Sequence, residues 1–314
     1  MKILVVGGAG FIGSHLVDRL LSEDHTVDVV DDLSSGSLAN LADARSSGGA
    51  FKFHHLDAAS ADADSLIGMR TPEVIHLLTP PAPATATPHE QARHIEIVIA
   101  TLEAARRHGV SKVVVAVPAS CVYGHPSVRS LPVKEGEVGQ LVARGVPGVL
   151  ARAVIDLLVS YRDVHALEFT ALAMASVYGP RATTGVVQSF VEAASSGVGP
   201  VVHGDGRQTR DLLYVDDAVD ALAKATTHGG GLVINVGTGE QTSVAELWQR
   251  VATLVPGASE LEIHQGPARL DELARFAVSP VRARIHLAWS PWTDLDDGLA
   301  RVLDPPPPAT QTLR

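Results

Sequence analysis

The sequence predicts an α/β protein built on a doubly wound parallel sheet, with a smaller lobe at the C-terminal end. Short valine-rich runs have the length of buried strands, helical patterns alternate with them, and glycine-rich turns replace this alternation after residue 176. We expect a first domain at 1–176 and a lobe at 177–303, some segments of which return to the first domain. A mobile tail is expected at 304–314, because its prolines prevent a helix.

The individual elements follow from hydrophobic periodicity. The run KILVVG at 2–7 is β-branched and bounded by glycine, and SHLVDRLLSED after it repeats apolar residues at helical spacing. A smaller-lobe helix is expected after the capping segment GTGEQTS. Further strands are expected at 27–32, 51–56, 73–78, 112–117 and 169–176, and further helices at 89–109 and 149–163.

Composition limits the partners of this chain. It has 314 residues and a formal net charge of -10, which argues against a nucleic-acid or anionic-membrane surface. The single cysteine, Cys121, excludes an intrachain disulfide framework, and the histidines lack metal-ligand spacing. No apolar run has the length of a membrane span, and MKILVVGG lacks the features of a signal peptide. We therefore expect a cytoplasmic protein with a small-molecule partner and no metal.

The segment GGAGFIG, between the first strand and the first helix, has the pattern of a phosphate-binding turn. Gly7 permits the tight turn, Gly10 lets the backbone approach a pyrophosphate, and Gly13 allows close packing of the helix. The N–H groups at the helix start, around Phe11 and Ile12, complete the expected site. This context predicts a Rossmann-type dinucleotide-binding domain.

Acidic residues follow the second strand, where the ribose of a dinucleotide is expected. Asp31 closes that strand about twenty residues after the glycines and can accept hydrogen bonds from both ribose hydroxyls. Asp31 and Asp32 would repel a 2′-phosphate, so we predict NAD and not NADP. Asp57 is equally compatible with an adenine contact and with a solvated loop. Leu77 and Leu78, which end the run EVIHLL, are expected beside the cofactor.

Up to about residue 303 the chain carries, in this order, the motifs GGAGFIGSHL, VDVVDDLSSG, VIHLL, VYG, VYGPR and GDGRQTRDLLYVDDAVDAL. With them it resembles the extended short-chain dehydrogenase/reductase family, and within it the nucleotide-sugar epimerases, dehydratases and decarboxylases. The resemblance implies that bound NAD oxidises a sugar carbon, usually C4, and later returns the hydride. It also implies a UDP- or dTDP-sugar substrate, with epimerisation at C4 as the leading outcome.

The resemblance implies four substrate contacts. It places Arg210, in GDGRQTRD, on the diphosphate, and Arg269 and Asp271, in ARLDE, on phosphate and the nucleotide ribose. Ser176 stands before VYGPR, where many relatives carry an asparagine. For the three charged residues, a surface salt-bridge network is the alternative.

The proton relay of the family has no counterpart at its expected positions. The resemblance implies a Tyr-x-x-x-Lys pair on the helix after VYG. Alignment through Tyr161 places Pro147 and Ala151 at these positions, and a shift of one residue gives Gly148 and Arg152. Neither register supplies a phenol.

A hydroxyl residue that the resemblance implies four residues before the VYG tyrosine is also missing, because Ala119 stands there. Arg152 could act only as a fixed charge, since its pKa is too high for proton shuttling. A packed or solvated role is the alternative for every catalytic candidate near this position. These candidates are Ser120, Cys121, Tyr123, His125 and Arg152.

Three functions stay open from the sequence. The first is an NAD-dependent nucleotide-sugar enzyme, foremost a 4-epimerase, with a non-standard proton relay. The second is a catalytically silent relative that binds NAD or a nucleotide sugar in a regulatory or partner role. The third is an enzyme of the same family that acts on a non-sugar substrate. A homodimer through the apolar helices at 90–108 and 149–162 is also expected.

Overall fold

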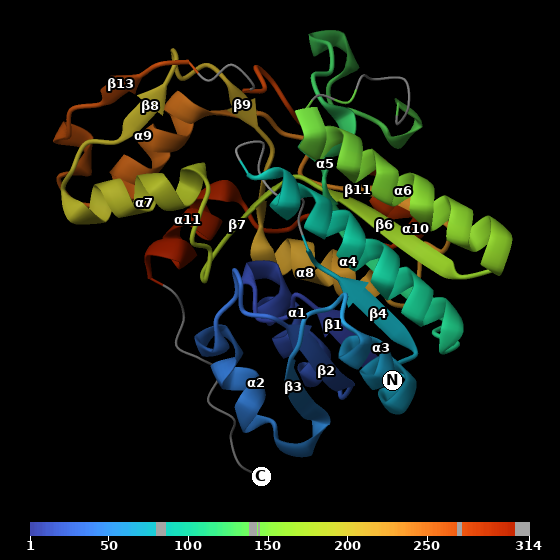
Figure 1. Ribbon diagram of the computed structural model, residues 1–314. Coiled ribbons are helices and arrows are strands. Elements are labelled where there is room, and N and C mark those ends of the chain that lie inside the picture. The colour runs from blue at the N-terminus through green and yellow to red at the C-terminus, as the bar shows by residue number, and fades with distance from the viewer. Residues whose placement is uncertain (80–85, 138–142, 144, 269–271, 305–314) are drawn as a thin grey trace.

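A seven-stranded parallel sheet forms the centre of the structure (Figure 1). Its strand order is β11-β6-β5-β4-β1-β2-β3, and the order reverses between β1 and β4. This confirms the predicted doubly wound α/β fold. The strands are β1 (Lys2–Val6), β2 (Thr26–Asp31), β3 (Phe51–His55), β4 (Val74–Leu77), β5 (Lys112–Pro118), β6 (Glu168–Met174) and β11 (Leu232–Val236).

The structure is a computed structural model, and it describes residues 1–79, 86–137, 143, 145–268 and 272–304. All strands predicted for the first domain are present, with ends within two residues of the expected positions. The seventh strand, β11, pairs with β6 and is the segment through which the C-terminal part of the chain returns to the first sheet. Apart from its first residue, the expected tail at 304–314 lies outside the described residues.

The helices pack on both faces of the sheet (Figure 1). Helix α3 contacts α4 and α4 contacts α6, whereas α1 contacts α2 and α8. Right-handed crossovers require this division, because the chain moves outward from β1 in one direction and from β4 in the other. The helices are α1 (Phe11–Ser22), α2 (Ala42–Ser46), α3 (Ala61–Arg70), α4 (Pro88–Arg107), α5 (Ala119–Tyr123), α6 (Gly145–His165) and α8 (Val215–Ala225).

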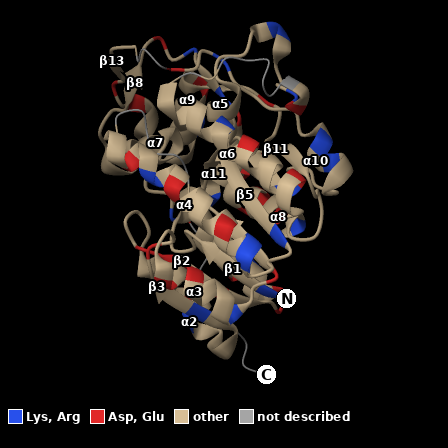
Figure 2. Cartoon of the chain, turned by 45° about the vertical axis from the view of Figure 1, so that its right-hand side comes forward, with Lys and Arg blue, Asp and Glu red and all other residues tan. Residues whose placement is uncertain are grey.

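Helix α6 begins at Gly145, four residues before the predicted start. Pro147 lies in its first turn, where the missing N–H has no intrahelical acceptor, so the proline does not interrupt the helix. Helix α4 begins with a reciprocal capping box between Thr87 and Glu90. Basic and acidic residues are interspersed along α4 (Figure 2). In the described part of the chain, no helix is both long and apolar enough to cross a bilayer.

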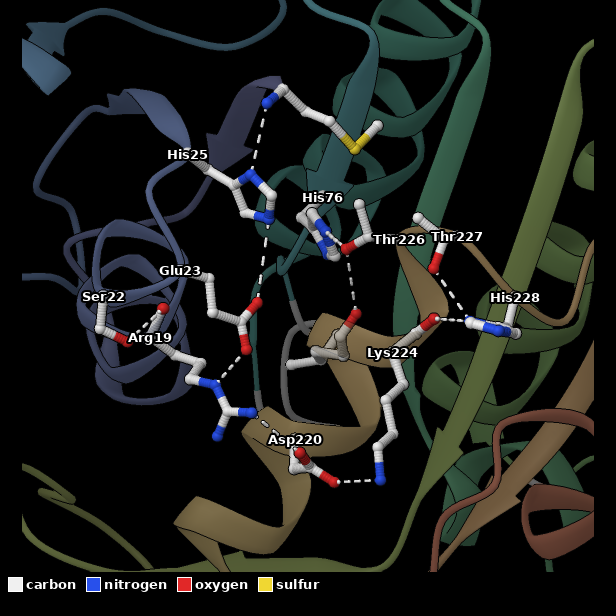
Figure 3. A network of polar contacts seen from close by, with 12 residues as sticks. Arg19, Ser22, Glu23, His25, His76, Asp220, Lys224, Thr226, Thr227 and His228 are labelled. Carbon is white, nitrogen blue, oxygen red and sulfur yellow. Dashed lines mark hydrogen bonds and ion pairs between the residues drawn. The ribbon is translucent and has the colours of Figure 1, made fainter.

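A chain of polar contacts fastens α1 to α8 (Figure 3). Arg19 of α1 donates to Asp220 of α8 at 3.2 Å, and Asp220 is paired with Lys224 at 2.9 Å. At the end of α8, the fully buried His76 of β4 lies 3.0 Å from the hydroxyl of Thr226. Helix α1 is therefore held along one side by α8.

The smaller lobe consists of short paired strands and helices (Figure 1). Buried Asp211 organises its base, because its carboxylate accepts hydrogen bonds from the backbone N–H groups of Thr238, Gly239 and Val278. The strand pairs are β7 (Ser176–Tyr178) with β10 (Leu212–Tyr214), β9 (Thr209–Arg210) with β12 (Thr242–Ser243), and β8 (Val201–His203) with β13 (His264–Gly266). The helices are α7 (Val186–Ser196), α9 (Val244–Leu254), α10 (Val281–His286) and α11 (Leu295–Leu303).

Candidate active site

A glycine cradle lies at the carboxyl ends of β1 and β4, where the strand order reverses. Gly7 has a φ of +80°, and a Cβ at this position would lie 2.8 Å from the carbonyl oxygen of Leu78. A Cβ at Gly13 would lie 2.2 Å from the carbonyl oxygen of Gly7, and one at Gly10 would lie 3.3 Å from the same atom. Buried Leu77 ends β4 beside this turn. Only glycine permits α1 to approach the turn this closely.

The start of α1 leaves backbone donors for a ligand. Gly10 is the N-cap residue and has no side chain, and the first intrahelical bond runs from the N–H of Ser14 to the carbonyl of Gly10. The N–H groups of Phe11, Ile12 and Gly13 therefore lack intrahelical acceptors. Together with the helix dipole, they form a site that fits a pyrophosphate.

Asp31 ends β2, and its carboxylate is almost fully buried. The two oxygens accept hydrogen bonds from the N–H groups of Ala9 and Leu33, both at 2.8 Å. Each oxygen keeps a second lone pair, so the group can also accept two ribose hydroxyls. Asp32 is exposed and accepts the N–H of Ser34 at 2.9 Å. The cradle and Asp31 together fit a dinucleotide.

Asp57 follows β3 and forms an ion pair with Arg93 of α4. The same carboxylate accepts the N–H of Ala59 at 2.9 Å, and Arg93 also contacts Glu96 at 2.5 Å. The Asp57 side chain is also 43% exposed, so it is both paired with Arg93 and partly solvated, and the adenine contact stays a prediction. Sequence reasoning missed Arg93, because periodicity does not show which residue of α4 points toward β3.

Helix α5 packs against α6 where the proton relay was expected. A Cβ at buried Gly148 would lie 3.2 Å from the carbonyl oxygen of Cys121, and Ala151 is fully buried. Tyr161, the tyrosine of α6, donates to Glu103 of α4 at 3.2 Å, at the far end of the helix. The first half of α6 therefore offers close packing and no phenol.

Arg152 is the cation of this region. Its Nε donates to the carbonyl oxygen of Val122 at 2.9 Å. Its Nη2 is buried and has no hydrogen-bond partner among the described residues. A buried N–H without an acceptor is costly, so this position suits an oxygen of a bound ligand.

Tyr123 links α5 to the edge of the sheet. It is fully buried, and its hydroxyl donates to the side-chain oxygen of Asn235 in β11 at 2.6 Å. The backbone N–H of Asn235 donates to Glu135 at 2.9 Å, and its side-chain amide donates to the carbonyl of Val133 at 2.9 Å. These contacts connect Tyr123 to β11 and to the segment around residues 133–135.

Ser120 and Cys121 are half-buried on α5, whereas His125 is exposed beyond it. Burial raises the pKa of the Cys121 thiol, and a hydrogen bond with Ser120 opposes this shift. The thiol is therefore protonated at neutral pH and is a weak base. Among the described residues, no group of three or more His, Cys, Asp or Glu side chains could hold a metal ion.

A cleft of about 1170 Å³ opens in the smaller lobe and is large enough for a nucleotide-sized ligand. Exposed Ser176 lies at its edge, with its backbone N–H bonded to the carbonyl of Asp211 at 2.9 Å. The segment from Tyr178 to α7 forms one wall, and Arg210 and Glu272 lie on another.

Arg210 is held in this wall by an ion pair with Glu272 at 2.9 Å. Its Nη1 also donates to the carbonyl oxygens of Thr209 and Leu273, both at 2.8 Å. The expected residues Arg269 and Asp271 lie outside the described residues. The prediction that they hold phosphate and the nucleotide ribose therefore stays a prediction. Sequence reasoning missed Glu272, because nothing in the loop sequence marks it as a partner of Arg210.

Comparison with known proteins gives consistent results. Residues 3–237 match the model of the NAD dependent epimerase/dehydratase family. The chain is 38% identical to the UDP-glucose 4-epimerase of Mycolicibacterium smegmatis, over 97% of this chain and 98% of that protein. A Thermotoga maritima UDP-glucose 4-epimerase solved with UDP-glucose aligns with a TM-score of 0.89 and 30% identity, covering 96% and 97% of the two chains. A Thermus thermophilus UDP-glucose 4-epimerase solved with NAD aligns with a TM-score of 0.86 and 27% identity, covering 97% and 98%.

Proposed function

The chain belongs to the NAD-dependent epimerase/dehydratase family, with NAD as its cofactor, and from this premise we propose that it is a UDP-glucose 4-epimerase. The observation that supports this choice is the similarity to the M. smegmatis enzyme over nearly the whole length of both chains. The test is to incubate the purified protein with UDP-galactose and to follow the anomeric proton by NMR. Formation of UDP-glucose is expected, and no conversion in either direction by NAD-loaded protein would contradict the proposal.

When bound, NAD would supply reversible hydride transfer at C4 of the sugar. In this proposal the N–H groups at the start of α1 hold the pyrophosphate, and Asp31 accepts the ribose hydroxyls. Arg210 binds the diphosphate of the substrate from the wall of the cleft, where Glu272 holds its guanidinium. These residues bind and orient both ligands without transferring a proton.

We also propose a non-standard proton relay. Arg152 presents a permanent positive charge at the α5–α6 contact, and its buried Nη2 donates to a ligand oxygen. Ser120 and Cys121 supply a hydroxyl and a thiol on α5, and neither is a strong base at neutral pH. Loss of a general base typically costs about 10²–10⁴-fold in rate, so we expect slow turnover that increases with pH.

The relay is tested with Arg152→Lys and Arg152→Gln. The lysine variant retains the charge, so we expect it to retain more activity than the glutamine variant, which we expect to be about tenfold slower or worse. Equal turnover numbers for the wild-type protein and both variants would exclude the role of the charge. Cys121→Ala tests the thiol separately. If the Cys121 thiolate is the base, the increase of the turnover rate at alkaline pH should be lost in this variant, whereas it should persist if hydroxide is the base.

A catalytically silent binding protein is the second candidate function, and the packing of α5 on α6 favours it. Gly148 and Ala151 leave little space for an added side chain at the expected relay. Calorimetry that detects NAD and UDP binding, together with no turnover of UDP-sugars, would support this function. If neither calorimetry nor thermal shift detects binding of UDP to NAD-loaded protein, a non-sugar substrate becomes the preferred alternative.

We further propose a homodimer formed by α4 and α6. Apolar side chains are exposed on both helices, with Ile99 at 42%, Val149 at 56% and Val159 at 42% relative exposure. The two helices are in contact and lie side by side in both views (Figures 1 and 2). Burying these side chains against a second copy would remove apolar surface from water. A monomeric mass by light scattering would contradict this proposal.

A further inference from the structure

One face of α1 lies along three successive residues of the loop that follows β7. Phe11, His15 and Asp18 share this face, because their spacing of four and three residues places them one above the other. His15 and Asp18 form polar contacts with residues 180 and 181 of this loop, and Phe11 lies beside Gly179.

The three pairs of neighbouring residues differ in kind. A Cβ at Gly179 would lie 3.6 Å from the ring of Phe11. The Nε2 of His15 lies 3.0 Å from the carbonyl oxygen of Pro180. The guanidinium of Arg181 donates to Asp18 at 2.8 Å and to Asp43 of α2 at 3.4 Å.

The backbone conformation of Arg181 indicates that its surroundings hold this residue in place. Its φ of +66° is left-handed, which costs a non-glycine residue about 1–2 kcal/mol unless its surroundings compensate. Its side chain is only 22% exposed, and one oxygen of Asp18 is buried without a hydrogen-bond partner among the described residues. Replacement of the guanidinium would leave a partly buried carboxylate without its counter-charge.

The two ends of this contact belong to different sites. Phe11 begins α1 at the N–H groups that fit the pyrophosphate of NAD. Beyond Arg181 the chain forms the wall of the cleft, with Ala182, Thr184 and Gly185 followed by α7. The loop therefore connects the cofactor cradle to the cleft in the smaller lobe.

We infer that binding of NAD at the start of α1 orders the wall of the cleft through this seam of residues 11, 15 and 18 with 179–181, and that Arg181 is its positioning residue. A ligand that reduces the motion of α1 also reduces the motion of the loop packed on it. The wall of the cleft then loses less conformational entropy when the second ligand binds. Only the identity of the second ligand, a nucleoside diphosphate group, rests on the proposed function. The coupling itself can be measured with NAD alone.

The test is hydrogen–deuterium exchange of the full chain with and without saturating NAD, followed in peptides covering 182–196. In wild type we expect NAD to slow this exchange by about fivefold or more, and in Arg181→Gln and Asp18→Asn by less than about twofold. Protection of residues 8–14 by NAD must persist in both variants, which shows that NAD is bound. Arg181→Lys, which can pair with Asp18 alone, should lie between wild type and Arg181→Gln.

The matched control is Arg250→Gln. Arg250 also bridges two acids, Glu246 at 2.8 Å and Asp296 at 2.9 Å, but it does so within the smaller lobe. Its variant should keep the wild-type response. Undiminished protection of 182–196 in Arg181→Gln, its loss in Arg250→Gln, or its absence in wild type would each overturn the inference. If Arg181→Gln does not fold, the nearly isosteric Asp18→Asn decides. Failure of UDP to bind would remove the proposed function and leave the coupling intact.

Discussion

Substitution of Gly13 by alanine tests whether the cradle requires the close approach of α1 to the glycine turn. The new Cβ would lie 2.2 Å from the carbonyl oxygen of Gly7 and 2.8 Å from the Cα of Gly8, both backbone atoms. An ordinary contact begins at 3.4 Å, so α1 must withdraw by about 1.2 Å at this point. Overpacking of this kind costs about 1–3 kcal/mol. Because each 1.4 kcal/mol is tenfold in affinity, we expect NAD to bind about 5- to 140-fold more weakly.

The assay for Gly13→Ala is titration calorimetry with NAD, combined with urea denaturation of the free protein. Both are needed, because part of the cost can appear as lost stability of the free chain. The control is Gly49→Ala, since a Cβ at Gly49 meets no atom within 4 Å and the residue has no left-handed φ. Stability within about 0.5 kcal/mol of wild type together with unchanged NAD affinity in Gly13→Ala would refute the reasoning.

Three further predictions follow from the structure. His94 is buried with no partner for either ring nitrogen among the described residues, and burial lowers its pKa to about 4. Because the unfolded form takes up the proton first, wild type should lose up to about 1.4 kcal/mol per pH unit as the pH falls from 6.5 toward 4. His94→Leu should be less sensitive to acid in urea denaturation at pH 7.5 and 5.0, and an equal loss in both proteins would contradict this. Arg210→Gln should weaken UDP binding by about tenfold or more in calorimetry, whereas Arg207→Gln, whose side chain is 89% exposed, should not; equal affinities would exclude the diphosphate contact. Val159→Glu should shift the mass in light scattering from dimer to monomer, and an unchanged dimer would place the interface elsewhere.

The sheet was predictable because parallel strands buried on both faces are continuous apolar runs that glycines and acidic residues interrupt. The cradle was predictable because backbone segments approach each other too closely for any side chain at Gly7 or Gly13. This requirement appears in the sequence as glycines at a fixed spacing. The early start of α6 was missed because Pro147 reads as a boundary, although proline is compatible with a first helical turn.

Contacts between distant segments could not be predicted from the same patterns. The pairing of Asp57 with Arg93 depends on which face of α4 points toward β3. The pairing of Arg210 with Glu272 joins two segments more than sixty residues apart, and the loop that carries Glu272 has no periodicity to indicate it. The hydroxyl of Tyr123 donates to Asn235 of β11, more than a hundred residues away, and the motif around the tyrosine does not indicate this contact.

The position of β11 has a consequence for biosynthesis. During translation, the first six strands of the sheet leave the ribosome before the strand that covers the edge of β6. Until residue 236 emerges, the nascent chain presents β6 as an open edge, and the hydroxyl of Tyr123 lacks Asn235. In the same way, the ammonium group of Lys112 cannot donate to the carbonyl oxygens of Ala225 and His228 until these residues emerge. The nucleotide-binding half is therefore exposed to edge-to-edge association, and to the chaperones that prevent it, until most of the second half has been made.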